Sequence, residues 1–501
     1  MSRLAEVFQG IHMNSGLLGR KLTRVTIYVS IVIISILLAI VVGKTNAKVG
    51  VALLAVLLGA PFAIAGLLNP KIGLLTTVAY SYFILFIKRV TGLYETPLGT
   101  LLEGLIFITL IGTLIKIINR RDFNTNFFKS PLFISFMVSV GYMLLEVFNP
   151  GVSSIAGWAF SLRATFLYIS VFICSFYCFN NDDAFVKIFS FFWLGLAALA
   201  ALYGLYQEFV GLPDFDLKWV YSSPIRFRLN FIWGRFRKWS FLSDSMTFGV
   251  FMAFAGIYSL VRAMGPYSIR RRIMFGFITL ITFWSMAYSG TRTAYAIVPI
   301  GVCLYILTTI DNGKTLLFAI GALSIFIFLI FGPIRNPVLD RVRSAFEPDE
   351  DASMQVRDEN RARIQPYIYA HPIGGGLLTT GEEGMRFYPN HPLAGYPPDS
   401  GYLKTALEMG WIGLILKLVL NITAILVGVS ACYKLKDPKL KNICLAYVCA
   451  VFAVSIADLA QMATSKQPIG LIIYCSYAIF IYFLEKAKKQ EKEQEQAGIS
   501  N

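Results

Sequence analysis

Residues 315–332 read TLLFAIGALSIFIFLIFG, a run without a charged side chain. As an α-helix such a run would extend about 27 Å, close to the ~30 Å hydrocarbon thickness of a bilayer. Backbone inside lipid must satisfy its own hydrogen bonds, so it forms either helices or a closed barrel. Because the hydrophobicity is continuous rather than alternating, this run predicts a transmembrane helix.

The same pattern recurs along the whole chain. Its 501 residues are 56% hydrophobic and 15% charged, with a mean hydropathy of +0.63, whereas soluble proteins carry about 25% charge. Long apolar runs alternate with short charged connectors, which predicts about fourteen spans. These spans lie at 25–43, 49–68, 72–87, 98–118, 131–148, 164–179, 185–210, 241–261, 273–289, 293–310, 315–332, 402–430, 441–459 and 467–484. The predicted fold class is an all-α integral membrane protein, a polytopic helical bundle of about 12–14 transmembrane helices with a large extracytoplasmic loop.

Charge placement predicts the orientation of the bundle. Lys and Arg in short connectors stay on the cytoplasmic side. The clusters Arg20–Arg24, Arg120–Lys129, Arg262–Arg272, Lys434–Lys441 and Lys486–Lys492 share one side if both termini are cytoplasmic. The net charge of +16 is thereby explained by topology, and we expect membrane lipids rather than nucleic acid as partners.

This orientation divides the chain into segments. We expect a cytoplasmic segment at 1–24, transmembrane helices at 25–332 and 402–484, and a cytoplasmic tail at 485–501. Two long connectors then lie outside, at 211–240 and 333–401. Long loops cross the membrane largely regardless of their charge, so their arginines do not contradict this topology.

The first outer loop, 211–240, interleaves basic and aromatic residues. Arg228, Arg235 and Arg237 alternate there with Phe, Tyr and Trp. Arginine forks bind phosphate bidentately, which suits a diphosphate. Binding of lipid headgroups by an interfacial helix is the alternative interpretation.

Arg292 lies in SGTRT, residues 289–293, between two adjacent predicted spans. An arginine at a membrane boundary is costly unless it is paired or hydrated. Its side chain could snorkel to the interface or contact an anionic substrate.

The large outer loop, 333–401, contains His371 and His391, each followed by proline, and Asp399 lies near its end. Asp399 or Ser400 could cap the helix that follows. Glu408 lies on that helix and could be buried and paired, or act as a general base.

These polar groups predict chemistry without a cofactor. Arginines can stabilise a diphosphate leaving group without a metal, and no clustered metal-ligand pattern or nucleotide-binding motif occurs. A histidine or carboxylate can deprotonate an acceptor hydroxyl. The candidate substrate-binding residues are Arg228, Arg235, Arg357, Arg361, His371 and Glu408.

Four motifs are found in the order RKWSFLSDSMTFG at 237–249, SGTRT at 289–293, AHPIGGG at 370–376 and DSGYLKTALEMGWIG at 399–413. Together they resemble the O-antigen ligase and O-antigen (Wzy-type) polymerase superfamily of bacterial envelope glycosyltransferases. The resemblance implies an enzyme of the bacterial cytoplasmic (inner) membrane whose active site is extracytoplasmic. The sequence departs from the family pattern at Ser240 and Ser245, which stand where the pattern has a glycine and a proline.

The resemblance also implies the reaction, an inverting, metal-independent glycosyl transfer from an undecaprenyl-diphosphate-linked glycan donor to a glycan or lipid acceptor. In that scheme Arg237 and Arg292 hold the diphosphate. Asp399 stands where ligases carry a histidine that activates the acceptor hydroxyl, and His391 is the alternative base.

Polymerase and ligase activity both remain open. A flippase or transporter of lipid-linked sugars is the alternative function, and it should place charged residues along the middle of several spans. Glu103, Glu146 and Glu208 are the few candidates for that role.

Overall fold

The computed structural model describes residues 59–94, 96–120, 123–232, 234–333, 336–346 and 352–499. The chain forms two compact units, 1–65 and 66–501, and the account below concerns the second. The predicted span at 25–43 lies outside the described residues. So does most of the span at 49–68, of which an apolar helix at Gly59–Leu68 is described.

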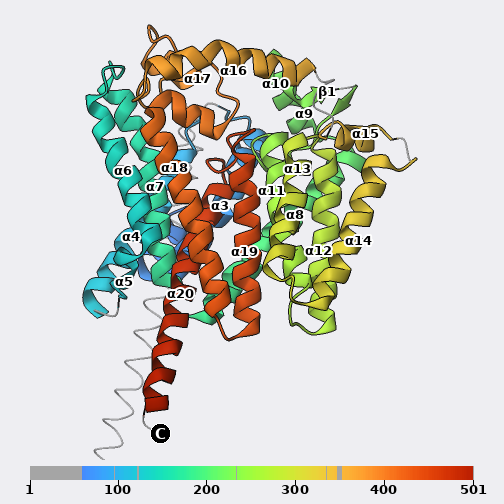
Figure 1. Ribbon diagram of the computed structural model, residues 1–501. Helices are drawn as coiled ribbons and strands as arrows, with labels where there is room; N and C mark the ends of the chain where they lie inside the picture. Colours follow the sequence, from blue (N-terminus) through green and yellow to red (C-terminus); the bar gives the residue numbers. More distant parts are fainter. Residues whose placement is uncertain are drawn as a thin grey trace, which may run out of the picture. The chain divides into compact units, whose positions relative to one another are not determined.

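Helices make up almost all of the second unit (Figure 1). The elements are α3 (Pro70–Thr91), α4 (Gly99–Arg120), α5 (Asn126–Lys129), α6 (Pro131–Leu145), η1 (Glu146–Phe148), α7 (Ile155–Phe179), α8 (Asp183–Phe209), α9 (Asp214–Tyr221), α10 (Pro224–Asn230), β1 (Phe231–Ile232), β2 (Arg235–Phe236), α11 (Ser245–Ala263), α12 (Ile269–Tyr288), α13 (Arg292–Thr308), α14 (Gly313–Phe331), α15 (Pro337–Arg343), α16 (Ala352–Ala370), α17 (Gly381–Phe387), α18 (Gly401–Lys434), α19 (Pro438–Ala457) and α20 (Ile469–Ile499).

The predicted fold class is confirmed. The protein is 77% helical, and ten helices of the described residues are long and apolar enough to cross a membrane. Two further helices, α12 and α13, coincide with the predicted spans at 273–289 and 293–310. In the described part of the chain, β1 and β2 pair as a two-stranded antiparallel hairpin.

Polar caps determine where several of these helices begin. The carboxylate of Asp182 accepts the backbone N–H of Phe185 at 2.8 Å at the start of α8. That of Asp244 accepts the N–H of Thr247 at 2.7 Å at the start of α11. Each cap satisfies an N–H that has no partner within its own helix. The caps therefore define the boundaries between apolar runs and loops.

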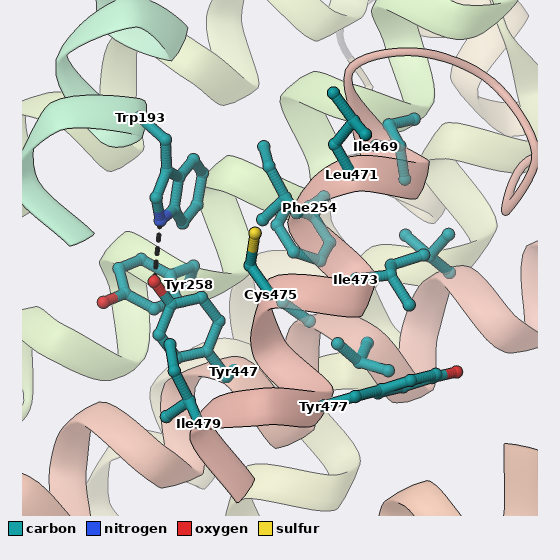
Figure 2. Close-up of a cluster of buried hydrophobic side chains, with 14 of the residues drawn as sticks. Trp193, Phe254, Tyr258, Tyr447, Ile469, Leu471, Ile473, Cys475, Tyr477 and Ile479 are labelled. Carbon is teal, nitrogen blue, oxygen red and sulfur yellow. Dashed lines mark hydrogen bonds between the residues drawn. The ribbon is translucent and has the colours of Figure 1, made fainter. Parts of the chain in front are cut away.

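Helices α11 and α19 form the centre of the bundle, since 83% of each span is buried. Figure 2 shows the aromatic packing beside them, where the indole Nε1–H of Trp193 donates to Tyr447 Oη at 2.8 Å. The rings of Tyr258 and Tyr447 lie 4.7 Å apart. This partner for the indole lets a large aromatic side chain be fully buried. In helix α14, by contrast, only 11% of the span is buried, so this helix lies on the outside of the bundle.

The polar segments gather at one end of the second unit, which we call the loop end (Figure 1). It carries α9 to β2 and α15 to α17. The opposite end, called the basic end, carries the α4–α5, α11–α12 and α18–α19 connectors and the tail of α20. Contacts at this end join the connectors to one another and to the tail of α20. They are Asn126 with Glu485 at 3.1 Å, Lys434 with Glu491 at 3.1 Å, and Tyr267 with the Lys439 carbonyl at 3.3 Å.

Candidate functional site

Two glycine-containing motifs pack backbone against backbone at the loop end. Gly410 has φ +63° and interrupts the helical geometry of α18. A Cβ there would lie 2.1 Å from the Pro372 carbonyl oxygen, and one on Gly374 would lie 2.5 Å from that of Glu408. The Trp411 N–H donates to the Pro372 carbonyl at 2.9 Å. Only glycine permits this approach, which attaches the large loop to α18.

Glu408 belongs to the same attachment. Its side chain is buried, accepts a hydrogen bond from the Thr380 hydroxyl and lies 3.8 Å from Lys404 Nζ. Of the two interpretations of Glu408 given above, these contacts favour the buried and paired one. The carboxylate holds the loop segment that contains Thr380.

Arg237 contacts the turn that precedes α13. Its Nε–H donates to the Ser289 carbonyl at 2.8 Å, and its Nη2 donates to Thr291 Oγ1 at 2.9 Å. A third bond runs from Nη1 to the Leu229 carbonyl at 3.2 Å, at the end of α10. Arg292 is the first residue of α13 and follows this turn directly. The structure therefore brings the two predicted arginines together although they are far apart in the sequence.

A third arginine reaches the same turn from the large loop. Arg341, on α15, donates from Nε to the Gly290 carbonyl at 2.9 Å. Gly290 has φ +59°, and a Cβ there would lie 2.9 Å from the Nε of Arg341 and 3.4 Å from that of Arg237. We call Arg237, Arg292 and Arg341 the arginine cluster.

The electrostatics of the cluster favour an anion. Burial and the neighbouring Arg341, with a smaller effect of Arg292, lower the pKa of Arg237 to about 10. At that value the guanidinium still carries its charge at neutral pH. Like charges held close together disfavour one another's ionised form, and a nearby anion reverses that effect. A bound phosphate group would therefore stabilise the cluster.

Sequence reasoning missed Arg341. No motif surrounds it, and it lies 51 residues from Gly290 in the sequence. The only signal was its place in the loop at 333–401.

The role of Arg89 was missed as well. Its Nε lies 2.9 Å from Asp216 Oδ1, and it donates to the Leu242 carbonyl at 2.7 Å, so it connects the loop at 211–240 to α3.

Asp399 is half-buried and lies two residues before the start of α18 at Gly401. Capping of that helix falls to Ser400, whose hydroxyl accepts the Leu403 N–H at 3.2 Å. The pKa of the nearby Tyr396 is raised by burial and by Asp399, while Arg363 and Arg361 act in the opposite direction. Asp399 therefore shares its surroundings with two basic residues and is not the helix cap.

The turn between α19 and α20 is organised by Asp458, a fully buried residue. Its carboxylate accepts the Ala463 N–H at 2.7 Å and the Thr464 hydroxyl at 2.8 Å. It also lies 2.6 Å from Lys417 Nζ. These contacts stabilise the turn through both its backbone and an ion pair.

That turn links Asp399 to the arginine cluster. The Asp458 carbonyl accepts the Ser400 hydroxyl at 3.0 Å and the Gly401 N–H at 2.9 Å. Three residues further on, Gln461 donates to Thr293 Oγ1 at 2.8 Å. One turn therefore contacts the residues that adjoin Asp399 and the residue after Arg292. Arg361 reaches it too, through the Leu459 carbonyl at 3.3 Å.

The two loop histidines differ in their surroundings. His391 Nδ1 accepts the Leu393 N–H at 3.1 Å, so its neutral ring carries the proton on Nε2. Burial, and His371 to a smaller extent, lower the pKa of His391. His371 is exposed, and its ring stacks on Tyr367 with centroids 3.9 Å apart.

The remaining candidates lie elsewhere. Arg228 on α10 and Arg235 on β2 are exposed, beside stacked rings that include Tyr221 and Phe227, 5.5 Å apart. The side chain of Arg357 lies outside the described residues. Within the described ranges there is no group of three or more His, Cys, Asp or Glu residues that could hold a metal ion.

Residues 275–418 match the family model for O-antigen ligase. The match begins in α12 and ends in α18, and it includes Arg292, Arg341 and Asp399. It contains three of the four motifs, at 289–293, 370–376 and 399–413, and it supports the resemblance to the O-antigen ligase and polymerase superfamily. The fourth motif, at 237–249, lies outside the matched residues. No curated protein matches the chain.

Proposed function

We propose that this membrane protein, an O-antigen ligase-like glycosyltransferase, transfers a glycan from a lipid-linked diphosphate donor to an acceptor hydroxyl at its loop end. The convergence of Arg237, Arg292 and Arg341 on one turn carries the proposal. Three guanidinium groups provide the charge and the planar forks that a diphosphate needs. By the family resemblance, the donor lipid is undecaprenyl diphosphate.

The proposed step is a single displacement. The acceptor oxygen attacks the anomeric carbon of the donor sugar, and the bond from that carbon to the diphosphate oxygen breaks. The diphosphate leaves with the electron pair, and the arginine cluster stabilises its charge without a metal. The acceptor proton passes to a general base. Attack opposite the leaving group inverts the anomeric configuration.

We assign the general base to Asp399. It occupies the position of the family's histidine, and Ser400 rather than Asp399 caps α18. In His391, Nδ1 is already used as an acceptor and Nε2 carries the proton. A carboxylate oxygen can accept a hydrogen bond from the acceptor hydroxyl, orient it and take its proton late.

The charge distribution supports an extracytoplasmic active site. The basic connectors gather at the end of the bundle opposite the arginine cluster, and such connectors stay in the cytoplasm. We therefore propose a protein of the bacterial inner membrane with both termini cytoplasmic. The loops at 211–240 and 333–401 would then be extracytoplasmic.

The flippase alternative has less support. Glu103 lies 2.8 Å from Arg163, and Glu208 lies 3.2 Å from Lys238. The carboxylate of Glu146 accepts a hydrogen bond from Asn149 at 2.9 Å. Each carboxylate thus has a local partner rather than a place along a polar path. Whether the acceptor is a growing glycan or a lipid core decides between polymerase and ligase.

Substitutions at the two predicted arginines test the proposal. Arg237→Ala and Arg292→Ala should each lower the transfer rate by roughly 10²–10³-fold, and lysine should restore little because it lacks the planar fork. Arg386→Ala is the control. It removes an exposed arginine of α17 that lies 3.8 Å from Glu383, and it should leave the rate unchanged. A normal transfer rate in either test variant at equal protein level would remove that arginine from the site.

The base has its own test. Asp399→Asn keeps the size of the side chain and removes its charge, so the rate should fall by about 10²–10⁴-fold. His391→Ala should have a much smaller effect. The reverse outcome, an active Asp399→Asn and an inactive His391→Ala, would make His391 the base.

A further inference from the structure

A second polar site lies at the basic end, away from the arginine cluster. It is a pocket of about 470 Å³. Its walls are the connector before α6 together with the start of α6, the turn between α7 and α8, and the part of α20 around residues 481–492. None of the motifs discussed above contributes to it.

The lining of this pocket is strongly basic. Five lysines and one carboxylate, Glu485, line it. Lys486 pairs with Asp183, and Lys488 lies 2.9 Å from Glu485. The other three lining lysines are Lys129, Lys489 and Lys492. The ion pair between Lys489 and Glu493 is long, at 4.0 Å, and both side chains are exposed. No described carboxylate lies within ion-pair distance of Lys129 or Lys492. The pocket therefore holds an excess of positive charge.

Hydrogen-bonding groups and an apolar surface accompany this charge. Asn180 and Asn181 contribute amide groups to the pocket, and Pro131, the first residue of α6, closes one side. One and two turns further along α6, Ile134 and Val138 are 48% and 51% exposed. Only 22% of that span is buried, so its outer face would meet lipid chains. A basic pocket therefore lies where an apolar helix surface begins.

We propose that this pocket binds the headgroup of an anionic phospholipid. The phosphodiester would lie among Lys129, Lys489 and Lys492, and the acyl chains would run along Ile134 and Val138 of α6. Clusters of lysines next to a membrane helix attract anionic headgroups in this way. The adjoining apolar face favours a lipid over free phosphate, because a soluble anion would make no use of it.

Binding of single lipids to the purified, detergent-solubilised full chain tests the proposal. Phosphatidylglycerol and phosphatidylcholine are titrated separately and counted by native mass spectrometry, with and without inorganic phosphate. The test variant is Lys129→Gln/Lys489→Gln/Lys492→Gln. The control, Arg270→Gln/Lys436→Gln/Lys439→Gln, removes the same charge from exposed residues of the basic end that do not line the pocket.

We expect the protein to bind phosphatidylglycerol in preference to phosphatidylcholine. Each lysine near an anionic lipid contributes a factor of about five, so the test variant should bind phosphatidylglycerol about a hundredfold more weakly. The control should stay within about threefold of the natural chain. Equal thermal unfolding of all three proteins without added lipid shows that the substitutions leave the fold intact.

Three outcomes would overturn the proposal. Equal weakening in the test and control variants would mean unspecific attraction to charge. Equal affinity for both lipids would mean that the headgroup charge is not recognised. Displacement of phosphatidylglycerol by inorganic phosphate at similar concentration would identify a site for free anions. No glycan donor is present in this experiment, so its failure is independent of that of the proposed transfer reaction.

Discussion

Arg341 offers the sharpest mutational test of the arginine cluster. Its Nε–H bond to the Gly290 carbonyl, 2.9 Å long, positions the guanidinium beside Arg237. A hydrogen bond to a charged group contributes about 1.5–3 kcal/mol, and each ~1.4 kcal/mol is a factor of ten in rate. Arg341→Ala should therefore lower kcat/KM by roughly 10- to 150-fold. Arg341→Lys should recover less than about tenfold of this, since it lacks the fork.

A second measurement separates binding from folding. Arg341 lowers the pKa of Arg237, so its removal relieves a repulsion between like charges in the unliganded protein. This relief opposes the loss of the bond to the Gly290 carbonyl, so the thermal unfolding temperature of Arg341→Ala without donor should change little. The stabilisation that the lipid-diphosphate donor adds should shrink. If the variant kept its kcat/KM, or gained as much stabilisation from the donor as the natural protein does, the assignment of Arg341 to the diphosphate site would be refuted.

Three further changes test other parts of the account. Gly290→Ala adds a Cβ at φ +59° that would lie 2.9 Å from Arg341 Nε. We expect this variant to lower the transfer rate at least about tenfold, because it displaces Arg237 and Arg341 without removing a charge. Burial lowers the pKa of His391, so the unfolded chain binds a proton below about pH 6.5 that the folded chain does not. Thermal stability should therefore fall as the pH drops from 7 to 5, and less so in His391→Gln. A cysteine at Glu382 should react with an impermeant maleimide in spheroplasts, whereas one at Lys436 should not, and the opposite labelling would invert the proposed topology.

The sequence predicted the helices well because each span is determined locally. The run predicted at 185–210 became α8, Asp183–Phe209, since continuous hydrophobicity and a polar cap are both properties of neighbouring residues. The break at Gly410 was not predicted. It depends on the close approach of Pro372, a contact that only the folded chain creates.

The candidate site was predicted in part for the same reason. Arg237 and Arg292 stood in motifs, but their meeting at Ser289–Thr291 depends on contacts between two segments that are far apart in the sequence. Arg341 carried no local signal. At Asp399 the pattern left two capping residues open, and only the hydrogen bond of Ser400 to Leu403 decided between them. Pairings over long sequence distances require the tertiary structure.

The most direct test of the central claim is reconstitution of the purified protein in liposomes that contain a lipid-diphosphate-linked glycan as donor, with a glycan or a lipid core as acceptor. Products are analysed by mass spectrometry in the presence of a metal chelator, and donor exposure on each face of the bilayer is followed in parallel. We predict a new glycosidic bond and one released lipid diphosphate for each bond formed, with loss of both in Asp399→Asn. Movement of intact donor across the bilayer without bond formation would contradict the account and identify a flippase.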